Sequence, residues 1–153
     1  MKILDLVDDV RSGCKSVLTT MTLEEYKKLS FFAFNNNGNI DGQRSVIKRS
    51  STAAKIRKRM ADDFRKGAIF PQVVLGVLFS TENMQNLDES KFYMLLESVN
   101  EGQISIIDGM QRSNIYFENY EDNKQQKIRV EFWCSDASTK LLYRMLVLNT
   151  GQV

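Results

Sequence analysis

The sequence contains no histidine, and that absence excludes several kinds of chemistry. A Ser-His triad, a histidine general base and a His-ligated zinc site all require an imidazole within the chain. The two cysteines, Cys14 and Cys134, are far apart and lack the spacing of metal ligands. We therefore expect two free thiols, no zinc and no haem.

Long apolar runs are also missing. No stretch approaches the roughly 18 apolar residues of a transmembrane helix, so we expect no membrane partner. Residues 1–13 contain acids where a signal peptide has its apolar segment, which predicts a cytoplasmic location. The length of 153 residues and the hydrophobic content of 42% are typical of one globular domain.

Positive charge is concentrated in one segment, although the net charge of the whole chain is only +2. Residues 44–66 have a net charge of +7, whereas residues 1–43 have −1 and residues 67–153 have −4. This pattern is typical of a protein with a phosphate-rich partner, either nucleic acid or nucleotide. The nine basic residues are Arg44, Lys48, Arg49, Lys55, Arg57, Lys58, Arg59, Arg65 and Lys66.

The order of hydrophobic patterns predicts an α/β (α+β) fold, a small mixed sheet with flanking helices. Ile3, Leu6, Val7 and Val10 have helical spacing, and the Thr-x-x-Glu sequence that begins at Thr22 is a capping box. Loops are expected at residues 34–42 and 81–90. Helices are expected at residues 2–11, from residue 22, at 52–66 and 110–120, and after the Ser-Asp pair at 135–136. Strands are expected at residues 72–80, 91–99, 104–109 and 127–134.

The stretch "SIIDGMQRSNIY", residues 105–116, is the strongest candidate site. A strand that ends at Asp108-Gly109 and continues directly into a helix presents backbone N–H groups and a positive helix end, a favourable seat for phosphate. Arg112 in the first helical turn could bind that phosphate with both arms of its guanidinium group, and Asp108 could hold Mg²⁺ or a ribose hydroxyl. In the alternative interpretation, Asp108 caps the helix and Arg112 forms an ion pair with it or with a surface acid.

The segment "IIDGMQR" resembles the motif of the DGQHR-domain proteins and of their restriction-type relatives with Asp-Gly-Gln-Gln-Arg. Both groups resemble the wider ParB/sulfiredoxin-like superfamily. Three further segments, "IFPQVVLGV", "KIRVEFW" and "VLNTGQV", resemble the family's elements in the same order. The resemblance implies a DGQHR/ParB-like domain over residues 44–153, truncated at its C-terminal end, behind an N-terminal helical extension over residues 1–43.

The resemblance also implies roles for individual residues. Asp108, Gln111 and Arg112 would be the catalytic residues, with Asp108 as the metal ligand. Met110 replaces the family's usual glutamine, and the reactive cysteine of sulfiredoxins is absent there, which excludes sulfiredoxin chemistry. The phosphate-binding residues would be Gly109, Arg112, Arg44, Arg49 and Asn149.

The basic helix at residues 52–66 is a second candidate interface. Ile56, Met60 and Phe64 recur every four residues, so this face is expected to dock on the sheet. The opposite face is either an ordinary solvated surface or a contact for DNA or RNA phosphates. The nucleic-acid-binding residues would be Lys55, Arg57, Lys58, Arg59 and Lys66.

Two functions of different classes follow. The first is a DNA- or nucleotide-binding module, regulatory or sensing, in a bacterial DNA-modification or phage-defence system, with other proteins of that system as partners. The second is a nucleotide-hydrolysing or nuclease-like restriction domain that uses Mg²⁺ and an NTP at the Asp-Gly-x-x-Arg turn. The missing histidine and Met110 favour binding over catalysis. Trp133, Phe132, Tyr116 and Phe117 are expected in the core rather than in a base-stacking platform.

Overall fold

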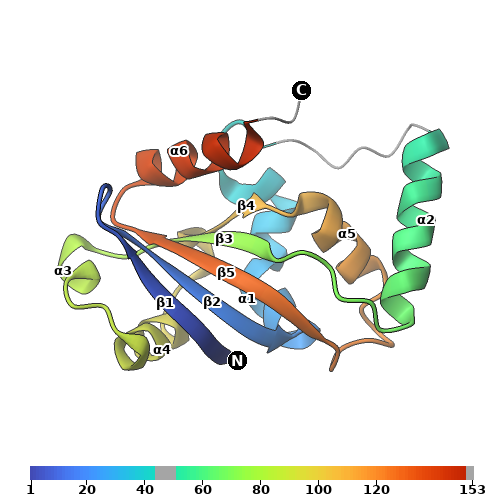
Figure 1. The fold of residues 1–153 in the computed structure, drawn as a ribbon, viewed down its shortest axis with the longest axis horizontal. Helices are drawn as coiled ribbons and strands as arrows, with labels where there is room; N and C mark the ends of the chain where they lie inside the picture. Colours follow the sequence, from blue (N-terminus) through green and yellow to red (C-terminus); the bar gives the residue numbers. More distant parts are fainter. Residues whose placement is uncertain (44–50, 151–153) are drawn as a thin grey trace.

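The computed structural model describes residues 1–43 and 51–150, and it confirms the expected α/β class with a mixed sheet. Five strands and six α-helices are interspersed along this part of the chain (Figure 1). The strands are β1 (Lys2–Asp9), β2 (Cys14–Thr22), β3 (Val73–Leu78), β4 (Ile104–Asp108) and β5 (Lys127–Ser135). The helices are α1 (Leu23–Asn35), α2 (Ser51–Arg65), α3 (Thr81–Met84), α4 (Glu89–Glu97), α5 (Met110–Glu118) and α6 (Ser138–Asn149). None of these helices is both long and apolar enough to span a bilayer.

The strands form one sheet in the order β1-β2-β5-β3-β4. The β3–β5 pair is parallel and the other three pairs are antiparallel. Val74 of β3 is opposite Asp108 of β4 on one side and opposite Glu131 of β5 on the other. This register brings one acidic residue on each neighbouring strand beside Val74, and the β3–β4 pairing is irregular at this point, between Val74 and Leu75.

The two faces of the sheet are covered by different helices. One face, with Val17, Leu75 and Phe132, belongs to the main core together with side chains of α1, α4 and α5. The other face packs Val74 and Trp133 against α6 in a smaller cluster (Figure 1). Each large side chain buried in this way contributes about 1.5–3 kcal/mol, so most of the fold's stabilisation comes from the main core.

The expected helix at residues 2–11 is wrong, because this segment is the edge strand β1. A bulge between Ile3 and Asp5 shifts the register, so that Ile3 is opposite Thr19 and Leu6 is opposite Val17. Ile3 and Leu6 therefore lie on the same face of the strand although they are three residues apart, which imitates helical spacing. The expected helical extension thus begins with two strands that belong to the same sheet as β3, β4 and β5.

The expected strand at residues 91–99 is also wrong. This segment belongs to α4, whose N-cap is Asp88, and the Asp88 side chain accepts a hydrogen bond from the Lys91 N–H at 2.8 Å. Phe92 is fully buried, and Leu95 and Leu96 pack against the same core from the next turn. This spacing of three and four residues is helical. The polar segment before it, expected to be a loop, contains α3.

The helix ends explain why the remaining elements were predictable. The capping box at Thr22 is confirmed, with reciprocal bonds between Thr22 and Glu25. Gly67, at φ +92°, follows α2, and its N–H donates to the carbonyl of Phe64 at 2.9 Å. The expected cap of α6 needs correction, because Ala137 and not Ser135 or Asp136 occupies the N-cap position. No side chain caps the first turn of α6. The Ser135 hydroxyl instead accepts from the Ala137 N–H.

The loop that precedes the undescribed segment covers the outer edge of β4. Asn39 donates through its amide to the carbonyls of Gly102 and Ile104, and Gln43 donates to those of Ile106 and Ile107 at 2.7 and 3.0 Å. The Ser105 hydroxyl donates back to the carbonyl of Asn39. Side-chain amides therefore take the place of a further strand at this edge.

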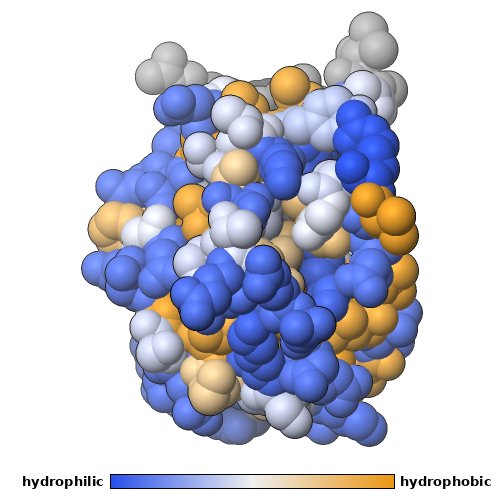
Figure 2. Space-filling view, turned by 90° about the vertical axis from the view of Figure 1, so that its left-hand side faces the viewer, coloured by the Kyte–Doolittle hydropathy of each residue, from blue (hydrophilic) through white to orange (hydrophobic). Residues whose placement is uncertain are grey.

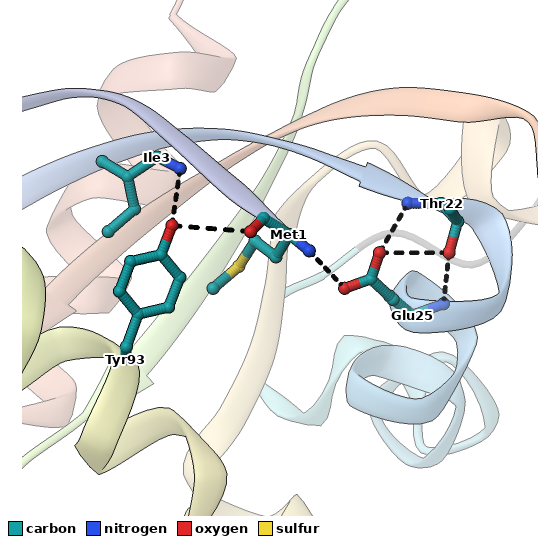
Figure 3. Close-up of polar contacts among 5 residues, drawn as sticks. All are labelled: Met1, Ile3, Thr22, Glu25 and Tyr93. Carbon is teal, nitrogen blue, oxygen red and sulfur yellow. Dashed lines mark hydrogen bonds and ion pairs between the residues drawn. The ribbon is translucent and has the colours of Figure 1, made fainter.

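The N-terminus is fixed to α1 and α4 (Figure 3). The ammonium group of Met1 lies 2.6 Å from Oε2 of Glu25, and the Tyr93 hydroxyl accepts from the N–H of Ile3 at 3.0 Å. Burial alone would raise the pKa of Glu25, but hydrogen bonds from the ammonium and from Thr22 lower it below its ordinary value.

Candidate functional site

The turn at the end of β4 has the predicted strand-turn-helix form. β4 ends at Asp108, Gly109 has φ +111° and ψ +24°, and α5 begins at Met110. A Cβ atom at position 109 would come within 2.5 Å of Cγ1 and 2.9 Å of Cβ of Val73. Glycine is therefore required here both by the backbone angle and by the close approach of β3.

Arg112 forms an ion pair with Asp108 and is held further by the backbone. Its Nη2 atom donates to Oδ2 of Asp108 at 2.9 Å and to the carbonyl of Gln72 at 3.0 Å. The side chains of Arg112 and Asp108 are 20% and 31% exposed. The structure thus contains the ion pair of the alternative interpretation, but Gly109 rather than Asp108 is the N-cap of α5, and no side chain caps this helix. A phosphate at this turn would compete with two existing bonds for Nη2.

The polar contacts of Arg112 continue across the sheet through two residues that the sequence did not single out. The amide of Gln72 donates to Oε1 of Glu131 at 2.8 Å, and the Ser16 hydroxyl donates to Oε2 of Glu131 at 2.6 Å. Glu131 is only 8% exposed, and burial of a carboxylate costs free energy. Each of its two oxygens accepts a hydrogen bond that offsets this cost. A connected set of polar groups therefore extends from Asp108 to β2.

Among residues 1–43 and 51–150, no group of three or more His, Cys, Asp or Glu side chains could hold a metal ion. The Mg²⁺ role of Asp108 stays a prediction, and so does the catalytic role of Gln111, which is half-buried in the first turn of α5. Arg44 and Arg49 lie outside the described residues. Asn149 is the last residue of α6, and within the described parts of the chain no hydrogen bond connects it to the turn.

The basic helix α2 is confirmed, but its docking differs from the prediction. It lies at one end of the molecule beside α5, where the ring of Phe64 is 4.9 Å from that of Tyr116 (Figure 1). Phe64 is its one buried residue among those described, and Ile56 is 55% exposed because α2 packs on α5 rather than flat on the sheet. Arg65 bonds Asp62 and Asn119. Lys55, Lys58, Arg59 and Lys66 are exposed, and Arg57 is half-buried.

The aromatic residues and cysteines are placed as predicted. Phe132, Tyr116 and Trp133 are at most 7% exposed, which confirms their core position, and Phe117 packs against the same core. Cys14 and Cys134 are free and buried, and burial raises the pKa of the Cys134 thiol above its ordinary value.

One surface was missed by the sequence analysis. The residues that line a cavity of about 830 Å³ between the β1–β2 turn and α6 include Arg11, Trp133, Lys140, Tyr143 and Arg144. Tyr143 and Arg144 follow Thr139 and Lys140 by one turn of α6, so the four side chains share one face of the helix. This four-residue spacing is the sequence signal from which the polar face could have been predicted.

The comparisons with known proteins gave no match: no family model matched the chain, and no curated protein or solved structure matched significantly. The resemblance of residues 108–112 to the DGQHR motif therefore stays a prediction. The function is argued below from the chain's own residues.

Proposed function

We propose that this protein binds the phosphate backbone of DNA through α2, without reading the base sequence. The observation that supports this most is the number of exposed cations on one helix with little acidic compensation. Lys55, Lys58 and Lys66 are exposed and form no ion pair with any residue in the described ranges. Helix α2 contains two acids, Asp62 and Asp63, and Asp62 is already paired with Arg65. A helix with this charge attracts a polyanion and releases its counterions.

The way in which α2 is held also supports the proposal. Phe64 fixes its C-terminal half against Tyr116, while Ile56 and the lysines around it remain exposed. The aromatic rings near this helix are used in the core, so stacking on unpaired bases has no support from them. Contact with the phosphates of a duplex is the simpler use of such a surface.

The ion pair Asp108–Arg112 favours binding over catalysis. Asp108 ends β4 and Arg112 lies in the first turn of α5, which packs against α2, so the turn and the basic helix are connected through one element. Nη2 of Arg112 already has two protein acceptors, whereas its Nε is buried without a hydrogen-bond partner in the described structure. We therefore assign the pair a supporting role for α5. A setting in bacterial DNA modification or phage defence is proposed on the motif resemblance alone.

Fluorescence anisotropy with a short labelled DNA duplex, measured over a range of salt concentrations, tests the proposal. We expect log Kd to change linearly with log salt, with a slope of about 0.9 for each phosphate contacted. The double variant Lys55→Ala/Lys58→Ala should lower the slope by about 2 and weaken binding by the same factor for unrelated sequences.

The matched control is Lys2→Ala/Lys28→Ala, which removes the same charge from exposed positions outside α2. If both double variants weaken binding equally, net charge rather than α2 determines affinity and the assignment is wrong. Absence of binding at low salt would refute the proposal as a whole.

A further inference from the structure

The cavity between the β1–β2 turn and α6 has no lining residue in the basic helix α2. The β1–β2 turn and the start of α6 lie at the end of the molecule opposite α2 (Figure 1). Its wall on α6 is one helical face, formed by Lys140, Tyr143, Arg144 and Val147 with Thr139. Leu141 and Met145, on the neighbouring face of α6, pack on the sheet. The burial of these two side chains therefore fixes the orientation in which the polar face meets the cavity.

Two arginines of the cavity form contacts with rings but no polar contact with any described residue. The guanidinium carbon of Arg144 lies 4.1 Å from the centre of the Trp133 ring, and that of Arg11 lies 5.1 Å from the centre of the Tyr143 ring. The Nε atom of Arg144 is buried without a hydrogen-bond partner in the described structure. Buried N–H groups in folded proteins nearly always have a partner, so this Nε is an exception. The terminal Nη groups of Arg144 also have no acceptor among the described residues, and these are the donors that a ligand in the cavity would use.

The charge of the cavity is positive. Arg11, Lys140 and Arg144 are opposed there by Asp9, which accepts a hydrogen bond from Ser12. Lys140 is paired with Asp136 at 3.1 Å, which leaves the two guanidinium groups as the cations without an acidic partner in the described residues. Guanidinium groups of this kind bind phosphate with two parallel bonds.

The cavity also has a place for a planar group. Tyr143 is 54% exposed and its ring lies beside Arg11, and both an aromatic ring and a guanidinium plane stack on a planar ligand. The side of the molecule with the β1–β2 turn and the start of α6 is mainly hydrophilic, with hydrophobic residues in separate patches (Figure 2). The volume of about 830 Å³ is within the range of small-molecule sites.

We propose that this cavity binds a small phosphorylated ligand with a planar ring, of the size of a mononucleotide. Arg144 and Arg11 bind the phosphate, and the ring stacks on Tyr143. The site shares no residue with α2, so its test is independent of DNA binding.

The fluorescence of Trp133 provides a direct readout, because it is the one tryptophan of the chain and lies under Arg144. The protein is titrated with AMP and, separately, with inorganic phosphate, at an ionic strength kept constant with NaCl. We expect a saturable change in both titrations and tighter binding of AMP. Arg144→Ala should weaken AMP binding about tenfold or more.

Two further variants make the test specific. The Arg11 side chain is exposed and contacts the Tyr143 ring, so Arg11→Ala should leave the protein folded. Because the variant removes one of the two guanidinium groups of the site, it should weaken AMP binding. Arg129→Ala is the matched control, because Arg129 is exposed on β5 outside the cavity. The proposal is overturned if NaCl reproduces the signal, if AMP binds no more tightly than phosphate, or if Arg129→Ala weakens binding as much as Arg144→Ala.

Discussion

Replacement of Gly109 by alanine is the change whose cost the structure defines best. The backbone at Gly109 has φ +111°, a region that costs an L-residue about 1–2 kcal/mol. The new Cβ would also lie 2.5 Å from Cγ1 and 2.9 Å from Cβ of Val73, and Val73 is fully buried in β3. Overpacking of this kind costs about 1–3 kcal/mol. The reduced freedom of the unfolded chain returns about 0.4–1 kcal/mol.

We therefore expect Gly109→Ala to lower the free energy of unfolding by about 1–4.5 kcal/mol. The matched control is Gly13→Ala, at φ +76° in the β1–β2 turn, where a Cβ would meet no atom within 4 Å. This control contains the backbone strain without the steric clash, so its cost should be about 1 kcal/mol. Urea unfolding, followed by circular dichroism, gives both values.

A second mutation separates the clash from other effects. Val73→Ala removes the Cγ1 atom that is nearest to the new methyl group, although the Cβ atom of residue 73 remains. The double variant Gly109→Ala/Val73→Ala should therefore be less destabilised than the sum of the single variants, by about 0.5–2 kcal/mol. Equal costs for Gly109→Ala and Gly13→Ala, with strict additivity in the double variant, would refute the reasoning.

Three other predictions concern the helix cap, the N-terminal ion pair and the buried thiols. Thr22→Ala should lower the free energy of unfolding by about 1 kcal/mol in urea, since it removes the N-cap of α1. The lowered pKa of Glu25 means that its contribution to stability is present above its ordinary pKa of 4.5 and is lost as pH falls through the lower folded value. Thermal unfolding of Glu25→Gln at several pH values should therefore differ from wild type near neutrality and converge with it in acid; a constant difference would contradict this. A thiol reagent should leave Cys14 and Cys134 unmodified in the native protein, where they are at most 2% exposed, and should modify both in urea.

Local signals in the sequence predicted the elements whose boundaries are set by local chemistry. The Thr22 capping box, Gly67 after α2 and the Asp108-Gly109 turn each fix an element through neighbours in the chain. β1 was predicted as a helix because its bulge depends on pairing with β2, which spacing alone does not reveal. For α4 a local signal existed: Asp88 is a favourable N-cap residue, and Phe92 and Leu96 are four residues apart, which is helical spacing. The continuous apolar run at residues 92–96 resembles a strand and concealed this signal.

The functional surfaces were predictable to different extents. The charge of α2 is visible in the sequence because its cations are contiguous. Glu131 could not be connected to Arg112, because the contact passes through Gln72 and depends on β3 lying between β4 and β5. The cavity combines Arg11 with Arg144 from opposite ends of the chain, and only the order of the strands and the docking of α6 bring them together.

The side-chain amides of Asn39 and Gln43 donate hydrogen bonds to carbonyls of β4. As a result, the two edge strands of the sheet, β1 and β4, are protected in different ways against pairing with a strand of another molecule. At the β4 edge, the carbonyls of Ile104, Ile106 and Ile107 already accept hydrogen bonds from uncharged amides, and this protection does not depend on ionic strength. At the β1 edge, protection comes from the bulge and from the exposed carboxylate of Asp5, whose repulsion salt screens. We therefore expect salt to promote self-association of this protein through strand pairing, and we expect the pairing to occur at the β1 edge of the sheet.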